Sequence, residues 1–335
     1  MIMNDTNNVA FDIYRGIAII FIIILHSGVT TPNLNQFDFL FSYLTRMNTA
    51  MELFFVISGY LIYKSIHKLK NNQNKSKIFF LKRSAKILPL YYIFFLINYI
   101  VYFIFVNQFE GFEAFSLNTI NPWDLNWNNF FIHLFLLQGF APAYLSSFVD
   151  GSWSIVSEVY FYILMFFIFY KFLNNALNSY RGYLLMLTIS IYGYIVLNYM
   201  MPEEGQFIFY FILNNLPSFF VGIIVYHIIH NDIIFDKIKK YSLEIFISGL
   251  ILYFGFTKGN MYPLAYNHIY GIIWGVLIIG SYSYLSNIKL NIITKTITKF
   301  GQQSYSLYYL HILFTHVNSY LLINVFHVGG GNKNG

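Results

Sequence analysis

Residues 11–28 read FDIYRGIAIIFIIILHSG, an apolar run that carries one arginine, Arg15, and one histidine, His26. On an α-helix the steps between these two residues complete almost a whole number of turns, so both side chains lie on one face, about 16.5 Å apart. A cation and a titratable ring inside an apolar helix are costly, so they usually have a partner or a function. The structural alternative is that Arg15 pairs with Asp12 one turn away and that His26 caps the helix at the outer membrane interface.

The whole chain has the composition of an integral membrane protein. Its 335 residues are 57% hydrophobic and 21% aromatic, and only 10% are charged, whereas about 25% is usual in a soluble domain. Apolar segments repeat from residue 9 to residue 326, and no polar stretch between them is long enough to fold separately. We therefore expect an all-α, polytopic transmembrane helix bundle, with one membrane domain over residues 1–328 and a flexible tail over 329–335.

About ten apolar segments are expected. They are 9–28, 48–66, 87–107, 129–141, 153–172, 182–201, 207–230, 241–257, 267–287 and 304–326. Segment 129–141 is shorter than the roughly 20 residues needed to cross a bilayer, so it is either re-entrant or interfacial, or one of ten full spans. The basic loops 64–86, 231–240 and 288–299 indicate a cytoplasmic side that includes the N-terminus.

Several classes of protein and of site are disfavoured. The net charge of +6 is concentrated in short loops between apolar runs, which is a topology signal rather than a sign of nucleic-acid binding. Cysteine is absent, so disulfides, thiolate catalysis and cysteine-bound metals are excluded. His227 and His230 are weak evidence for a metal, and no glycine-rich phosphate loop is present. We expect no metal, no tightly bound cofactor and no nucleic-acid partner, and the oligomeric state is left open.

Two further segments place charged side chains next to apolar runs. In MELFFVISGYLIY, residues 51–63, Glu52 opens a span and is either functional or an interfacial carboxylate. In FFLKRSAKILPLYY, residues 79–92, Arg83 and Lys86 are i, i+3 neighbours beside Lys82. These cations could bind phosphates together, or they could anchor the helix in the membrane.

Two later segments carry polar side chains on shared helical faces. In WSIVSEVYFY, residues 153–162, Glu158 lies one turn beyond Ser154 and could orient His26 or an acceptor sugar. Trp153 suits either an interfacial belt or stacking on a sugar ring. In GQQSYSLYYLHILF, residues 301–314, a polar stripe either lines a cavity or bonds neighbouring helices. The stripe consists of Ser304, Tyr308 and His311, and Tyr305 is adjacent to it.

These five segments, in this order, resemble the bacterial acyltransferase-3 family of membrane O-acyltransferases, from Phe11 to about Phe326. The Arg-x-x-Arg pattern of the family falls on Arg83 and Lys86, where lysine keeps the charge but loses the bidentate fork. The family pattern of Arg and His with ten residues between them matches Arg15 and His26, and an acid before Leu-Phe-Phe-Val-Ile-Ser-Gly matches Glu52 to Gly59. The pattern Trp-Ser-x-x-x-Glu matches Trp153 to Glu158. The pattern Ser-Tyr-Ser-Leu-Tyr-x-x-His matches Ser304 to His311.

The resemblance implies an acyl-CoA donor, usually acetyl-CoA, and a hydroxyl acceptor on a glycan such as capsule, lipopolysaccharide or a lipid-linked precursor. It also implies a multi-pass protein of the bacterial cytoplasmic (inner) membrane, in contact with membrane lipids and similar to stand-alone members. The hypothesis is that His26 is the general base or a transient acyl carrier, oriented by Glu158. The expected donor site comprises Arg15, Lys82, Arg83 and Lys86, and the expected acceptor or structural polar site comprises Glu52, Trp153, Ser154, Ser304, Tyr305, Tyr308 and His311. The main alternative is a transporter or flippase for a glycan or acyl carrier, which would also need intramembrane charge.

Overall fold

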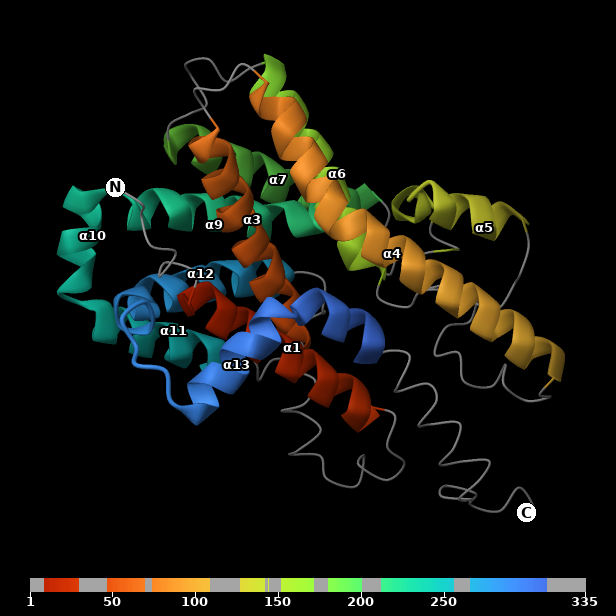
Figure 1. Ribbon diagram of the computed structural model, residues 1–335. Helices are drawn as coiled ribbons and strands as arrows, with labels where there is room; N and C mark the ends of the chain where they lie inside the picture. Colours follow the sequence, from red (N-terminus) through yellow and green to blue (C-terminus); the bar gives the residue numbers. More distant parts are fainter. Residues whose placement is uncertain are drawn as a thin grey trace.

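The computed structural model describes residues 9–29, 47–69, 74–108, 127–141, 144, 152–171, 180–200, 212–255 and 266–311. Within these ranges all regular secondary structure is helical, which confirms the all-α class (Figure 1). The α-helices are α1 (Val9–Val29), α3 (Ala50–Lys68), α4 (Lys75–Gln108), α5 (Trp127–Leu134), α6 (Ser152–Lys171), α7 (Tyr180–Met200), α9 (Ile212–Ile229), α10 (Asp232–Lys239), α11 (Ser242–Gly255), α12 (Tyr266–Leu285) and α13 (Ile292–Gln302). Residues 304–311 are also helical, and short 3-10 turns cover Met47–Thr49 and Gln138–Phe140.

Two of these helices, α10 and α13, occupy stretches that we expected to be loops. The Asn231 side chain accepts from the Ile234 amide at 3.1 Å and caps α10. Asn291 and Thr294 form a capping box at the start of α13. Polar caps of this kind satisfy the amides that a helix end leaves unpaired. The loop expectation was wrong because charge alone does not distinguish a loop from a short amphipathic helix.

The structure does not confirm that ten segments cross a membrane. Among the described residues, two helices, α1 and α12, are long and apolar enough to span, or three if α9 and α10, which meet at 90°, form one broken span. Charged side chains lower the hydropathy of α3. Helix α11, with 14 residues, is only about 21 Å long against a hydrocarbon core of about 30 Å.

Segment 129–141 does not form one spanning helix. Its α-helical part, α5, has eight residues and is about 12 Å long. Two tyrosines of α4 hold its end, since Tyr91 donates to the His133 carbonyl and Tyr92 to the Leu134 carbonyl, both at 3.0 Å. Of the last expected segment, 304–326, the structure describes residues up to 311. The expected tail, 329–335, lies outside the described residues.

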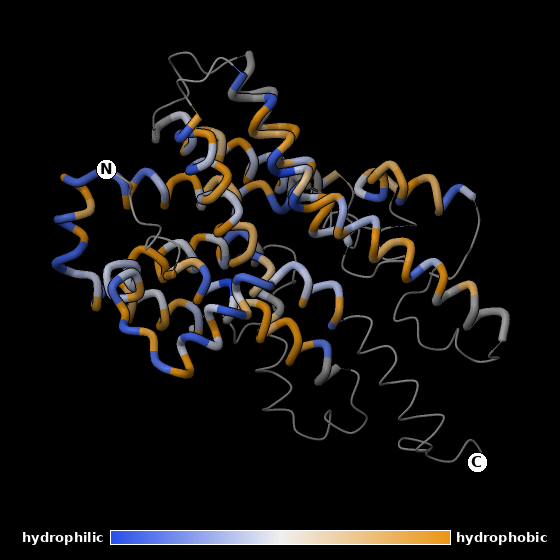
Figure 2. The backbone as a smooth tube through the Cα atoms, in the orientation of Figure 1, coloured by the Kyte–Doolittle hydropathy of each residue, from blue (hydrophilic) through white to orange (hydrophobic). Residues whose placement is uncertain are grey.

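Helices α4, α7 and α11 have outward faces that are strongly apolar. The exposed positions on α4 follow the i, i+3, i+4, i+7 spacing of a single helical face. Such faces are suited to lipid. In Figure 2 the tube of α10 carries more of the hydrophilic colour than that of α4. The residues are Ile93, Leu96, Ile97 and Ile100 on α4, Leu185, Ile189 and Tyr192 on α7, and Leu243, Ile247 and Ile251 on α11.

Close crossings through glycine set the positions of the inner helices (Figure 1). A Cβ at Gly59 of α3 would lie 2.0 Å from the Phe219 carbonyl oxygen of α9, and one at Gly222 would lie 2.0 Å from the Val56 oxygen. Likewise α13 lies against α1, where a Cβ at Gly301 would be 1.7 Å from the Asp12 oxygen. Backbone contact through small residues is typical of membrane helix packing. These crossings join α3 to α9 and α1 to α13, and α1 also packs against α3.

Candidate functional site

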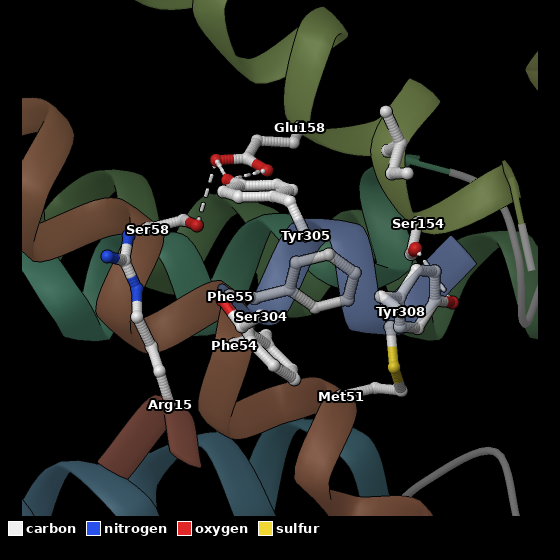
Figure 3. A pocket seen from close by; sticks show the side chains of 11 residues that line it. Arg15, Met51, Phe54, Phe55, Ser58, Ser154, Glu158, Ser304, Tyr305 and Tyr308 are labelled. Carbon is white, nitrogen blue, oxygen red and sulfur yellow. Dashed lines mark hydrogen bonds between the residues drawn. The ribbon is translucent and has the colours of Figure 1, made fainter. Parts of the chain in front are cut away.

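A small inner cavity lies where α1, α3, α6 and helix 304–311 meet (Figure 3). Its volume is about 40 Å³, and one water needs roughly 10 to 15 Å³ on this measure. The cavity therefore has room for a small group. It is lined by Arg15, Met51, Phe54, Phe55, Ser58, Ser154, Ile155, Glu158, Ser304, Tyr305 and Tyr308.

The buried carboxylate of Glu158 is the polar centre of this cavity. Ser58 donates to its Oε1 at 2.9 Å, Tyr162 donates to the same oxygen, and Tyr305 donates to Oε1 at 2.8 Å and to Oε2 at 2.7 Å. The three hydroxyls come from α3, α6 and helix 304–311, so one carboxylate ties three elements together; Figure 3 shows the contacts of Ser58 and Tyr305. A buried carboxylate needs such donors, and here they fix its orientation. Within the described part of the chain it makes no hydrogen bond to His26.

The polar stripe of helix 304–311 continues from this carboxylate along one wall. Ser154 of α6 donates to the Tyr308 hydroxyl at 3.0 Å, one turn from Tyr305 (Figure 3). His311 follows a further turn along the helix, buried to 5% exposure. His311 lies six helical steps after Tyr305, a rise of about 9 Å. Polar groups thus extend in one direction from Glu158.

A second, larger cavity of about 260 Å³ opens beside the first and is rich in cations. Its lining contains five cationic side chains and one carboxylate. The lining residues are Phe11, Asp12, Arg15, Leu61, Lys64, Ser65, Lys68, Arg83 and Lys86. Arg15 lines both cavities, and in Figure 3 its guanidinium extends from α1 toward Ser58. We call this second cavity the cationic cavity.

Contacts with neighbouring helices hold the cations of the cationic cavity in place. The Arg83 guanidinium donates to the Leu61 carbonyl at 2.9 Å and to the Ser65 hydroxyl, which joins α4 to α3. Arg15 pairs with Asp12 at 4.0 Å, and Asp12 also accepts from Gln302 of α13 at 3.2 Å. The pairing of Arg15 with Asp12 that we considered as a structural alternative therefore occurs, but Arg15 also lines both cavities.

Lys86 lies just before the apolar run 87–107, with its ammonium 5.3 Å from the centre of the Tyr305 ring. This position is suited to a cation–π contact. Desolvation, together with the like charges of Arg15 and Arg83, lowers the pKa of Lys86 to about 8, although part of the side chain is exposed. An anion bound in the cationic cavity would favour the charged ammonium.

His26 and His311 face each other at the other end of the polar stripe. The His311 Nε2 lies 3.2 Å from the His26 Nδ1, and the ring centres are 4.9 Å apart. The same Nδ1 of His26 is 2.9 Å from the Ile22 carbonyl oxygen. The sequence predicted that His26 shares a helical face with Arg15, and both do lie on the continuous α1. It did not predict that His311 would be the neighbour of His26.

The expected site residues therefore divide between several places. Lys82 is exposed and lines neither cavity, and Glu52 is buried against Ser218 of α9, which donates to it. Trp153 packs on Phe55 with ring centres 6.1 Å apart. The residues that line the cavities or form the histidine pair are Arg15, His26, Arg83, Lys86, Ser154, Glu158, Ser304, Tyr305, Tyr308 and His311.

Some site residues were missed by the sequence analysis. Tyr162 lies one turn beyond Glu158, a spacing that could have suggested the hydrogen bond. Ser58, Ser65 and Lys68 recur at helical spacing on α3, and this repeat signals a polar face that reaches both cavities. We took the lysines of 64–77 as topology anchors, yet Lys64 and Lys68 line the cationic cavity.

The two histidines considered as metal ligands pack against aromatic rings. The His227 ring centre is 4.8 Å from that of Tyr63, and His230 stacks on Tyr226 at 4.0 Å. Within the described ranges no three His, Asp or Glu side chains gather as a metal site would require.

A comparison with protein-family models decides the family. The acyltransferase-3 model, described as an acyltransferase domain, matches residues 8–331. The chain belongs to the acyltransferase-3 family. A search of curated proteins and of solved structures gave no significant match. Membership, together with the apolar helices, identifies this acyltransferase-3 protein as a membrane acyltransferase.

Proposed function

We propose that this acyltransferase-3 protein transfers an acyl group, most simply acetyl, from acyl-CoA to a hydroxyl of a cell-surface glycan or its precursor. The observation that carries the proposal is Arg15, which lines both the cationic cavity and the inner cavity built around Glu158. One side chain thus joins a site suited to a polyanion to a site suited to a small uncharged group.

The donor binds by its phosphates in the cationic cavity. Arg83 offers a planar fork that is suited to phosphate oxygens, while Lys64, Lys68 and Lys86 act as point charges. With five cations against one carboxylate, the lining would gain most from a multiply charged ligand such as the diphosphate and 3′-phosphate of CoA. In this scheme the binding of the donor phosphates does not require a metal ion, because cationic side chains supply the positive charge.

The thioester end of the donor enters beyond Arg15. The donor passes Arg15, which lies about 16.5 Å along α1 from His26, and its thioester lies between the inner cavity and the histidine pair. Glu158 keeps Tyr305 and Ser58 in place around the same space. The small volume of the inner cavity supports a short acyl group such as acetyl.

The acceptor approaches the histidine end. The lone pair of His26 either removes the proton of the acceptor hydroxyl or takes up the acyl group transiently before passing it on. The rise of about 16.5 Å between Arg15 and His26 along α1 places donor phosphates and acceptor at opposite ends of the site. We place the protein as a multi-pass, single-domain enzyme of the bacterial cytoplasmic membrane, with the cationic cavity toward the cytoplasm as the loop charges indicate.

The family membership favours chemistry over transport. A transporter or flippase would move its substrate without forming a covalent product. The hydrogen-bonded cluster at Glu158 and the histidine pair at the other end of the stripe are the kind of fixed polar groups that acyl transfer uses.

The test is acyl transfer by the purified protein in lipid nanodiscs. Acetyl-CoA labelled in the acetyl group is supplied with glycan extracted from cells that lack the protein, and labelled glycan is measured by mass spectrometry. In parallel, the acylation of the same glycan is compared between cells with and without the protein. Label in the glycan that depends on the protein supports the proposal, whereas an unchanged acylation profile in both assays would contradict it.

A further inference from the structure

The neighbours of the His26 Nδ1 decide which of the two ring nitrogens of His26 carries the proton when the ring is neutral. The His26 Nδ1 has two neighbours, the Ile22 carbonyl oxygen at 2.9 Å and the His311 Nε2 at 3.2 Å. A carbonyl oxygen can only accept a hydrogen bond. If Nδ1 carried no proton, two lone pairs would face each other across 2.9 Å. The proton of neutral His26 therefore belongs on Nδ1.

This tautomer assigns a role to each nitrogen of the pair. With the proton on Nδ1, the His26 Nε2 keeps its lone pair, which is the electron pair that either a base or an acyl carrier uses. The single Nδ1 proton is then shared between the Ile22 carbonyl oxygen at 2.9 Å and the His311 Nε2 at 3.2 Å, both of which accept from it. His311 is 5% exposed and belongs to the same helix as Tyr305 and Tyr308, so its ring is held by the wall of the inner cavity rather than by a loop.

We propose that His311 is the positioning residue of His26: its Nε2 accepts from the His26 Nδ1 and thereby directs the reactive Nε2 lone pair toward the acceptor hydroxyl. The inference rests on the proposed function and extends it, because it gives His311 a role in the proton transfer rather than in lining an acceptor cavity. The arrangement parallels the acid–histidine pair of hydrolases, with a neutral imidazole in the place of the acid.

In the reaction, His26 carries the proton of the acceptor hydroxyl to the leaving thiolate of CoA. The acceptor oxygen forms a bond to the thioester carbon while its proton moves to the His26 Nε2. His26 is then an imidazolium, whose Nδ1 proton remains hydrogen-bonded to His311. The carbon–sulfur bond breaks, the thiolate of CoA leaves with the electron pair, and the Nε2 proton passes to that thiolate. No oxidant or further reactant is needed, and His311 returns to its starting state.

The test uses two substitutions and two acceptors. His311→Gln keeps an acceptor atom near the position of the imidazole Nε2, whereas His311→Phe keeps a ring and removes the acceptor. Each variant is assayed in nanodiscs with labelled acetyl-CoA and either the extracted glycan or hydroxylamine, after subtraction of the rate without enzyme. Hydroxylamine attacks a thioester through its neutral nitrogen and does not require a base for deprotonation.

We expect His311→Phe to lower kcat with the glycan about 10- to 100-fold, the range found when a partner that orients a metal-bound histidine is lost. Its rate with hydroxylamine and its KM for acetyl-CoA should stay near wild type, and His311→Gln should retain most of the glycan activity. A merely structural role would lower both rates together, and would make the Gln variant no better than the Phe variant.

Three results would overturn the inference while leaving the proposed function intact: wild-type glycan activity in His311→Phe, an equal loss with both acceptors, or equal damage by Gln and Phe. If the Phe variant does not fold, as judged by thermal unfolding in detergent, His311→Leu takes its place in the same comparison. Absence of labelled glycan with the wild-type protein would instead contradict the proposed function, and this inference with it.

Discussion

The cationic cavity and the inner cavity share Arg15 but differ in how their charges are balanced. The inner cavity, of about 40 Å³, has one carboxylate that receives hydrogen bonds from three hydroxyls. The cationic cavity, of about 260 Å³, has five cations around one carboxylate. The first is a site whose polar atoms are already fixed by the protein. The second has an excess of positive charge that a bound polyanion would neutralise.

This difference separates the consequences of substitution at the two ends. Fixed groups near the reacting atoms act mainly on kcat, whereas groups that bind the unreactive part of the donor act mainly on KM. Substitutions in the two cavities should therefore change different kinetic constants.

The largest effect is expected at His26. The His26→Ala variant should lose about 10²- to 10⁴-fold in kcat, the usual contribution of a positioned base, with little change in KM for acetyl-CoA. Labelled-glycan formation in nanodiscs measures this loss. His230→Ala, at the end of α9, is the matched control and should keep normal activity. Full activity of folded His26→Ala would remove His26 from the mechanism.

The next largest effect is expected at Glu158. Glu158→Gln preserves the shape of the side chain, but its amide group cannot accept from all three hydroxyls, so Tyr305 and Ser58 lose their fixed positions. We expect kcat to fall about 10- to 100-fold, the range seen when a group that holds other functional residues is lost.

Tyr162→Phe provides the comparison for Glu158, because it removes one of the three donors and leaves the carboxylate. Loss of one hydrogen bond of about 1 kcal/mol corresponds to about a fivefold effect. If Tyr162→Phe were as damaging as Glu158→Gln, the carboxylate itself would not be the important group.

A smaller effect, confined to donor binding, is expected at the cationic cavity. Replacing both Lys64 and Lys68 by alanine should raise the KM for acetyl-CoA about tenfold, since two partly exposed charge contacts contribute together about 1.4 kcal/mol. The value of kcat should not change. The KM of the wild-type protein should also rise with salt more steeply than that of the variant.

The matched control for these lysines is the double replacement of Lys77 and Lys82 by alanine. Both side chains are exposed cations of α4 that line neither cavity. An equal rise of KM in the control would mean that general positive charge, and not the cationic cavity, attracts the donor.

The smallest effect is expected from pH. The pKa of Lys86 is lowered to about 8, so its ammonium loses its proton as the pH rises through that value and contributes less to phosphate binding. The KM for acetyl-CoA should therefore rise modestly between pH 7 and 9. In Lys86→Arg, which stays charged over this range, that rise should be smaller. If KM rose with pH in Lys86→Arg as it does in the wild-type protein, Lys86 would be excluded as the cause of the rise.

The sequence was most informative where one helix carries the whole pattern. Arg15 and His26 belong to the uninterrupted α1, so their shared face follows from the residue spacing alone. Most apolar segments likewise became helices near their expected positions. Sequence reasoning failed for α10 and α13, whose boundaries depend on the capping residues Asn231 and Asn291, and the expected ten crossings are not confirmed within the described residues.

The partners of the functional side chains were harder to predict than the residues themselves. Glu158 was expected to orient either His26 or an acceptor, but it receives hydrogen bonds from Ser58, Tyr162 and Tyr305. His26 instead lies against His311, 285 residues away in the chain. Contacts of this kind depend on the crossing of separate helices, and no residue spacing encodes them.

The sequence by itself determined that this is a helical membrane protein, which chemical groups lie in or beside its apolar segments, and which of them share a helical face, because composition and helical periodicity are local properties. Only the tertiary structure decided that Arg15 joins two cavities, that Glu158 is held by three hydroxyls, and that His311 meets His26. The physical reason is the close approach of helices at Gly59, Gly222 and Gly301, where backbone contact fixes the distances between side chains from different segments.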